Sequence, residues 1–125
     1  MGDLGVPVGD YAREAFQDLG LAEALHSRLV PMVNEPAVLN AVAGGACERG
    51  VAYATGSLRQ GEAVTVLATF PADSHRPIHY KGCILADADH PRAAHAFLDF
   101  VTGGEGAALL QAAGLRAPTA PLYGD

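Results

Sequence analysis

The stretch Ala63–Phe70, with the sequence AVTVLATF, consists mainly of β-branched and apolar residues and predicts a buried β-strand. Further short apolar runs predict strands of the same kind at Val30–Val33, Gly50–Ala54 and Ile78–Leu85. Pro71 and Pro77 bracket a loop between the last two of these strands. We therefore expect a sheet that is built from short strands.

Helical patterns fill the intervals between the predicted strands. In residues 10–19 the apolar side chains recur at helical spacing, Asp10 can cap the helix, and Gly20 ends it. Further helices are predicted at 21–29, from Asn34-Glu35-Pro36 onward, from Asp89-His90-Pro91 to Gly103-Gly104, and at 106–113. Because helices alternate with strands, the sequence predicts an α/β fold with a central, mostly parallel sheet flanked by helices and followed by C-terminal helices.

The composition excludes several classes of protein. The 125 residues are enough for one domain, and 50% of them are hydrophobic, so we expect a folded core. The chain has 8 Lys and Arg against 14 Asp and Glu, and this formal net charge of −6 argues against a nucleic-acid binder. No apolar run approaches the ~20 residues that a membrane-spanning helix needs.

The sequence contains no recognisable catalytic or metal-binding motif. A phosphate-binding glycine loop, a nucleophile elbow and a zinc-protease motif are all absent. His75 and His79 have no carboxylate or thiol cluster around them in the sequence, so no free-cation site is expected. Cys47 and Cys83 are interpreted as two small buried thiols, with a disulfide or a reactive thiol as alternatives. We expect that the protein is not an enzyme, and a small enzyme using Cys, His or Tyr is kept as an alternative.

Three turns lead into predicted helices and can present backbone N–H groups to a ligand. They are Val6–Tyr11, Asn34–Pro36 and Tyr53–Ser57. The N-terminus of a helix has unpaired N–H groups and a positive dipole end, which suits a small anion without any Lys or Arg. The hydroxyl of Tyr53 can add a further donor. The alternative interpretation is that these are ordinary capped turns and a core tyrosine.

Several segments resemble, in order and spacing, the molybdate-binding proteins of bacterial ABC transporters. The most extensive are VPVGDYAREA at 6–15, GVAYAT at 50–55 and ATFPADSH at 68–75, the last of which is close to that family's ATFPEDSH. Shorter similarities follow in the same order at Arg28–Pro31, Pro77–Tyr80, Ala93–Phe100 and Gly114–Arg116. The resemblance extends from about residue 2 to residue 117.

The resemblance implies one lobe of a type II periplasmic-binding-protein fold. In that family two α/β lobes close around a tetrahedral oxyanion, and this chain is similar only to the second half. Residues 1–125 are expected to form a single domain, with an oxyanion-binding lobe at 1–85 that is truncated at its first strand, C-terminal helices at 86–117 and a tail at 118–125. The implied function is to bind molybdate or tungstate and to deliver it to the permease of an ABC transporter, without a cofactor or covalent chemistry.

The resemblance also implies which residues hold the oxyanion. Val8 and Glu35 stand at the positions of two backbone N–H donors, and Tyr53 stands at the position of a hydroxyl donor. The chain departs from the family's usual residues here. Val8 replaces a small alanine, Glu35 replaces an apolar residue, Pro36 removes one N–H, and Gly56 stands where the family often has Asp.

If this half of the binding cleft binds no anion, we expect a different function. An uncovered lobe face would expose apolar side chains, and the chain would then be a non-binding remnant that acts only as a self-association module, such as a homodimer. The resemblance implies a periplasmic location. Residues 1–10 have neither the basic nor the apolar region of a secretion signal, which predicts a cytoplasmic product if the chain is complete.

Overall fold

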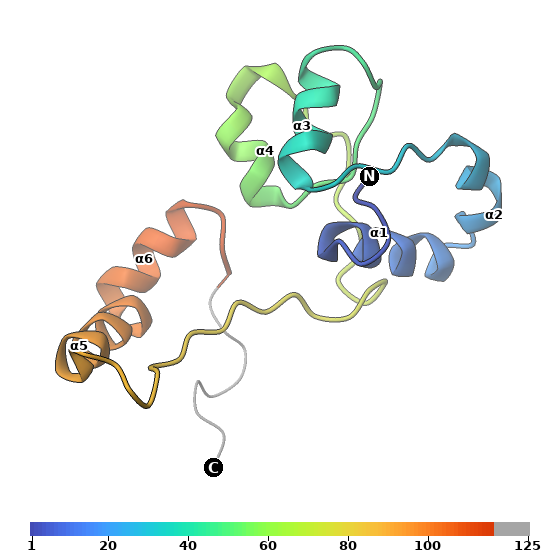
Figure 1. The fold of residues 1–125 in the computed structure, drawn as a ribbon. Coiled ribbons are helices and arrows are strands. Elements are labelled where there is room, and N and C mark those ends of the chain that lie inside the picture. The colour runs from blue at the N-terminus through green and yellow to red at the C-terminus, as the bar shows by residue number, and fades with distance from the viewer. Residues whose placement is uncertain (117–125) are drawn as a thin grey trace. The chain divides into compact units, whose positions relative to one another are not determined.

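The computed structural model describes residues 1–116, and the chain forms two compact units (Figure 1). Unit 1 is Met1–Ile78 and unit 2 is His79–Asp125. The elements of unit 1 are α1 (Pro7–Asp18), α2 (Ala22–Leu25), η1 (His26–Arg28), α3 (Glu35–Ala43), α4 (Ala54–Gln60) and η2 (Gly61–Ala63). Those of unit 2 are α5 (Pro91–Thr102) and α6 (Gly104–Ala112).

The described residues contain no β-sheet, so the predicted fold with a central, mostly parallel sheet is wrong. Strand-like pairing within residues 1–116 is limited to one isolated parallel bridge between Gly2 and Met32. Two hydrogen bonds flank this bridge, from Asp3 N to Met32 O at 2.8 Å and from Met32 N to Met1 O at 2.9 Å. The predicted strand Val30–Val33 therefore contributes a short contact and no ladder.

The remaining predicted strands have no neighbouring strand. Residues 64–70 and 78–85 run as irregular chain without a ladder, and 51–53 leads directly into α4 (Figure 1). Leu67 is 74% exposed and Tyr80 is 71% exposed. A β-branched composition suits a pleated and half-buried surface, but only pairing with a distant part of the chain creates that surface. The local pattern carries no information about such a partner.

The helix predicted at 10–19 is present as α1, but it begins earlier, at Pro7. Proline has no N–H to leave unsatisfied, and its fixed φ suits the first helical position. Asp10 therefore lies within the first turn and is not the N-cap, and its Oδ1 accepts a hydrogen bond of 3.2 Å from Gly5 N. Gly20 ends the helix as predicted, with a φ of +68° that disfavours other residues.

The core of unit 1 lies along one face of α1. Ala12, Ala15 and Phe16 are at most 7% exposed. Met1 joins Ala12 and Phe16 in a buried cluster, and the rings of Phe16 and Phe70 meet edge to face with 5.7 Å between their centroids. Partly buried apolar side chains pack around this cluster, namely Ala22, Leu25, Leu29, Val51 and Phe70. The amphipathic pattern of α1 is therefore satisfied within unit 1.

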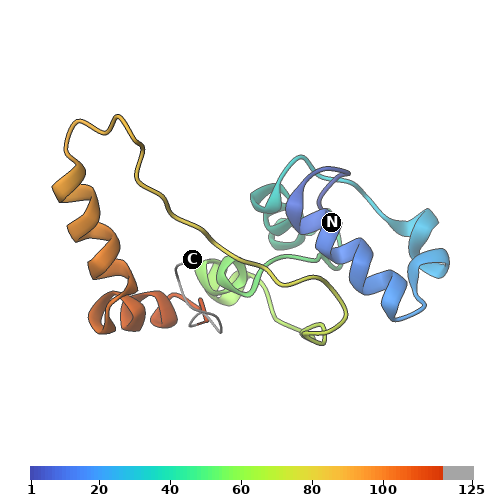
Figure 2. The ribbon, with the colours of Figure 1, turned by 90° about the horizontal axis from the view of Figure 1, so that it is seen from below.

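Helices α3 and α4 lie side by side in both views (Figures 1 and 2). The side chain of Asn34 caps α3, because its Oδ1 accepts a hydrogen bond of 2.9 Å from Ala37 N. Val38 and Leu39 form the buried face of α3, with exposed fractions of 2% and 6%. The helix predicted from Asn34 onward is thereby confirmed.

The described part of unit 2 contains two helices, α5 and α6, that meet at a sharp corner (Figure 2). The second helix begins at Gly104 rather than at the predicted Gly106. Gly106 lies so close to α5 that a Cβ atom there would be 2.7 Å from Val101 Cα. Gly106 is the single buried residue in the range 79–116, and the Phe97 side chain is 63% exposed. The apolar face of α5 is therefore largely uncovered within the described part of unit 2.

Candidate functional site

Glu35 and Tyr53, two of the three predicted binding residues, are in direct contact. Glu35 is the first residue of α3, and Tyr53 is the N-cap of α4. The Tyr53 N–H donates a hydrogen bond of 2.8 Å to Glu35 Oε1. This contact attaches the start of α4 to the start of α3.

Val8, the third predicted residue, is the second residue of α1, and it is 3% exposed. Pro7 before it has no N–H, and the N–H of Gly9 after it donates to Val6 O at 2.8 Å. Among the first three positions of α1, Val8 alone has an amide that no hydrogen bond within residues 1–116 uses. The start of α1 thus has one backbone N–H group, that of Val8, that makes no hydrogen bond within residues 1–116.

The start of α3 repeats this arrangement. Pro36 has no N–H, and the Ala37 N–H is already taken by the side chain of Asn34 at 2.9 Å. The amide of Glu35 is the one left unused among the first three positions of α3, counting all hydrogen bonds of the described residues. Each helix start therefore has, among its first three positions, a single N–H group that can donate a hydrogen bond to a ligand oxygen.

Tyr11 connects Tyr53 with α1. The two rings meet edge to face, with 6.4 Å between their centroids. Tyr11 follows Val8 by about one turn of the same helix. The structure therefore brings Glu35 and Tyr53 together directly, and it connects Val8 to them through α1 and the Tyr11 ring.

The loop 71–77 also packs against Tyr11. The His75 ring lies 5.8 Å from the Tyr11 ring, and Arg76 Cζ lies 5.0 Å from the Tyr11 centroid. Glu14 holds the loop at two points, since its Oε2 accepts a hydrogen bond of 2.9 Å from Arg76 N and its Oε1 lies 2.9 Å from Arg76 Nη1. A hydrogen bond with Tyr11, followed by the charge of Glu14, raises the pKa of Arg76. The positive charge of Arg76 is therefore maintained beside Tyr11.

Three features of this region were not found from the sequence: the ring of Tyr11, the guanidinium of Arg76 and the side-chain carboxylate of Glu35. Arg76 and Glu14 are 62 positions apart, and no local pattern relates them. The available signal was the pair of prolines that bracket the loop, which marks it as a constrained turn without naming its partner.

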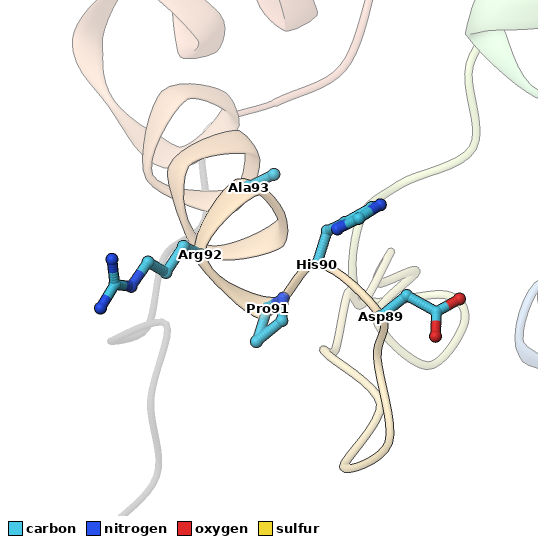
Figure 3. A pocket seen from close by; sticks show the side chains of 5 residues that line it. All are labelled: Asp89, His90, Pro91, Arg92 and Ala93. Carbon is cyan, nitrogen blue, oxygen red and sulfur yellow. The ribbon is translucent and has the colours of Figure 1, made fainter.

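Two hollows in the surface are lined by residues other than these. A depression of about 410 Å³ is lined by Ala22, Glu23, His26 and Ser27. A second one, of about 420 Å³, lies at the start of α5 and is lined by the consecutive residues 89–93 (Figure 3). Arg92 points to the opposite side from Asp89 and His90 in that view, so the charged groups do not converge on one point.

Other predicted features can be compared with the described residues. None of their His, Cys, Asp and Glu side chains form a group of three or more that could hold a metal ion. Cys47 and Cys83 are free thiols. The prediction that both are buried is wrong, because Cys47 is half-buried and Cys83 is exposed in the segment that forms no sheet. No helix within residues 1–116 has both the length and the apolar character required to cross a bilayer.

Residues 2–116 match the model of a protein family described as bacterial extracellular solute-binding protein. The chain belongs to this family. Its members bind solutes and are not enzymes, which confirms the expectation from the sequence. The resemblance that the sequence motifs indicated is likewise confirmed.

Three relatives of this solute-binding protein are informative. The molybdate-binding protein ModA of Escherichia coli K12 is 30% identical over 106 residues, which cover 85% of this chain and 40% of that protein. Its counterpart of the same name in Haemophilus influenzae is 33% identical over 85 residues, or 68% of this chain and 33% of that protein. YvgL of Bacillus subtilis, provisionally named an ABC transporter substrate-binding lipoprotein, is 29% identical over 112 residues, or 90% and 43%. The chain spans less than half the length of each relative.

Proposed function

We propose that this chain carries part of a binding site for a tetrahedral oxyanion, molybdate or tungstate. The donors are the backbone N–H groups of Val8 and Glu35 and the hydroxyl of Tyr53. The solute-binding protein to which these residues contribute works in the periplasm and delivers the anion to the permease of an ABC transporter. Two relatives that are named molybdate-binding proteins support the choice of anion.

The observation that carries this proposal is the pair of uncommitted amides at the starts of α1 and α3. These helices have 12 and 9 residues, so each presents a full first turn and a positive dipole end. Backbone N–H groups are neutral donors in fixed positions, which lets them bind a dianion without a compensating cation. Tyr53 supports the same site, because it touches Glu35 of α3 and Tyr11 of α1.

A thermal-shift titration of the 125-residue chain with molybdate, tungstate and sulfate tests the proposal. An anion at 100 times its dissociation constant should stabilise the folded state by about 2.7 kcal/mol, which raises the melting temperature measurably. We expect the rise with molybdate and tungstate and not with sulfate. Size-exclusion chromatography of the same samples gives the oligomeric state.

The variant Tyr53→Phe tests the role of the hydroxyl group. Removing a hydrogen bond to a charged ligand should weaken molybdate binding by roughly 1.5–3 kcal/mol. Tyr80→Phe is the matched control, since Tyr80 belongs to unit 2 and is 71% exposed. An unchanged affinity in Tyr53→Phe removes this side chain from the site.

The same titration separates the proposal from the self-association alternative. A chain that forms a stable dimer and shows no rise in melting temperature with any of the three anions contradicts the binding proposal. That result favours a non-binding remnant. A selective rise with molybdate contradicts the remnant, whatever the oligomeric state.

A further inference from the structure

The side chain of Glu35 is held in a defined position beside α4. Its exposed fraction is 13%, Oε1 accepts the Tyr53 N–H at 2.8 Å, and Oε2 lies 3.6 Å from Arg59 Nη2. The Glu35 carboxylate packs closely against Gly56. A Cβ atom at position 56 would collide with Glu35 Oε1 and lie 2.8 Å from Glu35 Cδ. The Glu35 carboxylate therefore fills the space that a side chain at position 56 would take.

The carboxylate completes the N-terminal cap of α4 from a different helix. In a capping box, the third residue of a helix carries a Glu or Gln side chain that accepts the N–H of the N-cap residue. Here the N-cap is Tyr53 and the third residue is Gly56, which has no side chain. The Tyr53 side chain makes no capping bond either. Glu35, on α3, supplies the acceptor that α4 itself lacks.

We propose that Glu35 is a positioning residue for Tyr53 and acts through its side-chain carboxylate. The carboxylate accepts a hydrogen bond from Tyr53 N and packs closely against Gly56. Together these contacts hold the backbone of Tyr53 at a fixed place relative to the start of α3. This inference rests on the proposed function, because Tyr53 is the ligand donor that is held. Glu35 thus contributes to the site twice, through its own N–H group and through the placement of Tyr53.

The positioning role needs an acceptor oxygen and not a negative charge. A glutamine at position 35 offers an amide oxygen of the same reach, and it removes a charge that repels a bound dianion. Glu35→Gln should therefore keep Tyr53 in place and bind molybdate at least as tightly as the wild type. Glu35→Ala removes the acceptor, and Gly56→Ala displaces the carboxylate while leaving Glu35 in the sequence.

The ion pair with Arg59 is a minor part of this arrangement. The Arg59 side chain is 72% exposed, and an exposed ion pair is screened by solvent and contributes little. Arg59→Ala leaves the bond between Glu35 and Tyr53 intact and is a matched control for the loss of charge. Gly104→Ala is the control for adding a methyl group to a glycine, because nothing lies within 4 Å of a Cβ atom there.

The test compares nitrogen-15 amide spectra and molybdate calorimetry for the full chain and these variants. We expect the Tyr53 amide resonance to stay in place in Glu35→Gln, Arg59→Ala and Gly104→Ala. It should move in Glu35→Ala and Gly56→Ala. Molybdate affinity should fall at least about tenfold in Glu35→Ala, the loss expected when a bond to a charged ligand is no longer formed. Rescue of both readouts by glutamine identifies the acceptor as the functional group.

The possible negative results distinguish the positioning role of Glu35 from the proposed oxyanion binding. A Tyr53 amide that is unchanged in both Glu35→Ala and Gly56→Ala overturns the positioning role. So does a moved amide with an unchanged molybdate affinity. If the wild type and Glu35→Gln both bind no oxyanion, the proposed function is overturned, and the amide comparison still reports whether Glu35 holds Tyr53.

Discussion

Helices α1 and α5 are built alike, but only α1 buries its apolar face. Each has 12 residues and begins with a proline, in unit 1 and unit 2 respectively. Phe16 on α1 is 7% exposed, whereas Phe97 on α5 is 63% exposed. Five residues of α1 are buried, and none of α5 is. The two helices therefore differ in their surroundings and not in their own pattern.

The surroundings explain the difference. Phe16 meets Met1 and Phe70, which come from opposite ends of unit 1, and these side chains exclude water from the face of α1. In the described part of unit 2, α5 is met by α6 at Gly106, where the close approach leaves no room for a side chain. An amphipathic pattern identifies the apolar face of a helix, and only tertiary contacts decide whether that face is buried.

The largest expected effect is the loss of a buried aromatic ring from the face of α1. Phe16→Ala should destabilise unit 1 by about 3–5 kcal/mol, because it removes a buried ring and leaves a cavity. Phe97→Ala should change stability by no more than about 0.5 kcal/mol, because its ring is already exposed. Urea unfolding of both variants, followed by circular dichroism, measures the contrast. Equal losses would show that α5 is covered as well as α1.

A smaller effect is expected at the corner of unit 2. Gly106→Ala places a Cβ atom 2.7 Å from Val101 Cα, and backbone cannot yield as a flexible side chain does, so the cost should be about 1–3 kcal/mol. Gly104→Ala, with open space around it, should be neutral or slightly stabilising. Amide hydrogen exchange in α5 and α6 reports the difference. Unaltered exchange in Gly106→Ala would contradict the close crossing.

The smallest effect is expected for the attachment of the loop 71–77 to α1. Glu14 and Arg76 form a double contact, but their side chains are 30% and 59% exposed, so solvent screens the pair. Arg76→Ala should increase hydrogen exchange in the loop at low salt, and this increase should shrink in high salt. A salt-independent effect would show that ring packing on Tyr11, and not charge, holds the loop.

Much of the helical structure could be predicted from the sequence. The helices beginning near Asn34 and Pro91 and the end of α1 at Gly20 follow from caps, prolines and glycines, which act within a few residues. The absence of a sheet from residues 1–116 could not be predicted, because residues 64–70 have a strand-like composition but no neighbouring strand. The local sequence determines whether a segment favours an extended backbone, whereas a sheet also requires a second strand from elsewhere in the chain.

The candidate site was predicted as separate residues and not as an arrangement. Val8, Glu35 and Tyr53 were named from motif positions, and that resemblance treats Glu35 only as a backbone donor. The bond from Tyr53 N to Glu35 Oε1 depends on Gly56 leaving a space, which is a fact of three dimensions. Single positions in a sequence do not reveal such complementary pairs.

A molybdate titration of the full chain, followed by nitrogen-15 amide spectra, tests the central claim most directly. We expect the amide resonances of Val8 and Glu35 to shift together along one saturable curve, while the amide resonance of Gly104 does not move. Shifts confined to residues outside unit 1, or the absence of any saturable shift at Val8 and Glu35, would contradict it.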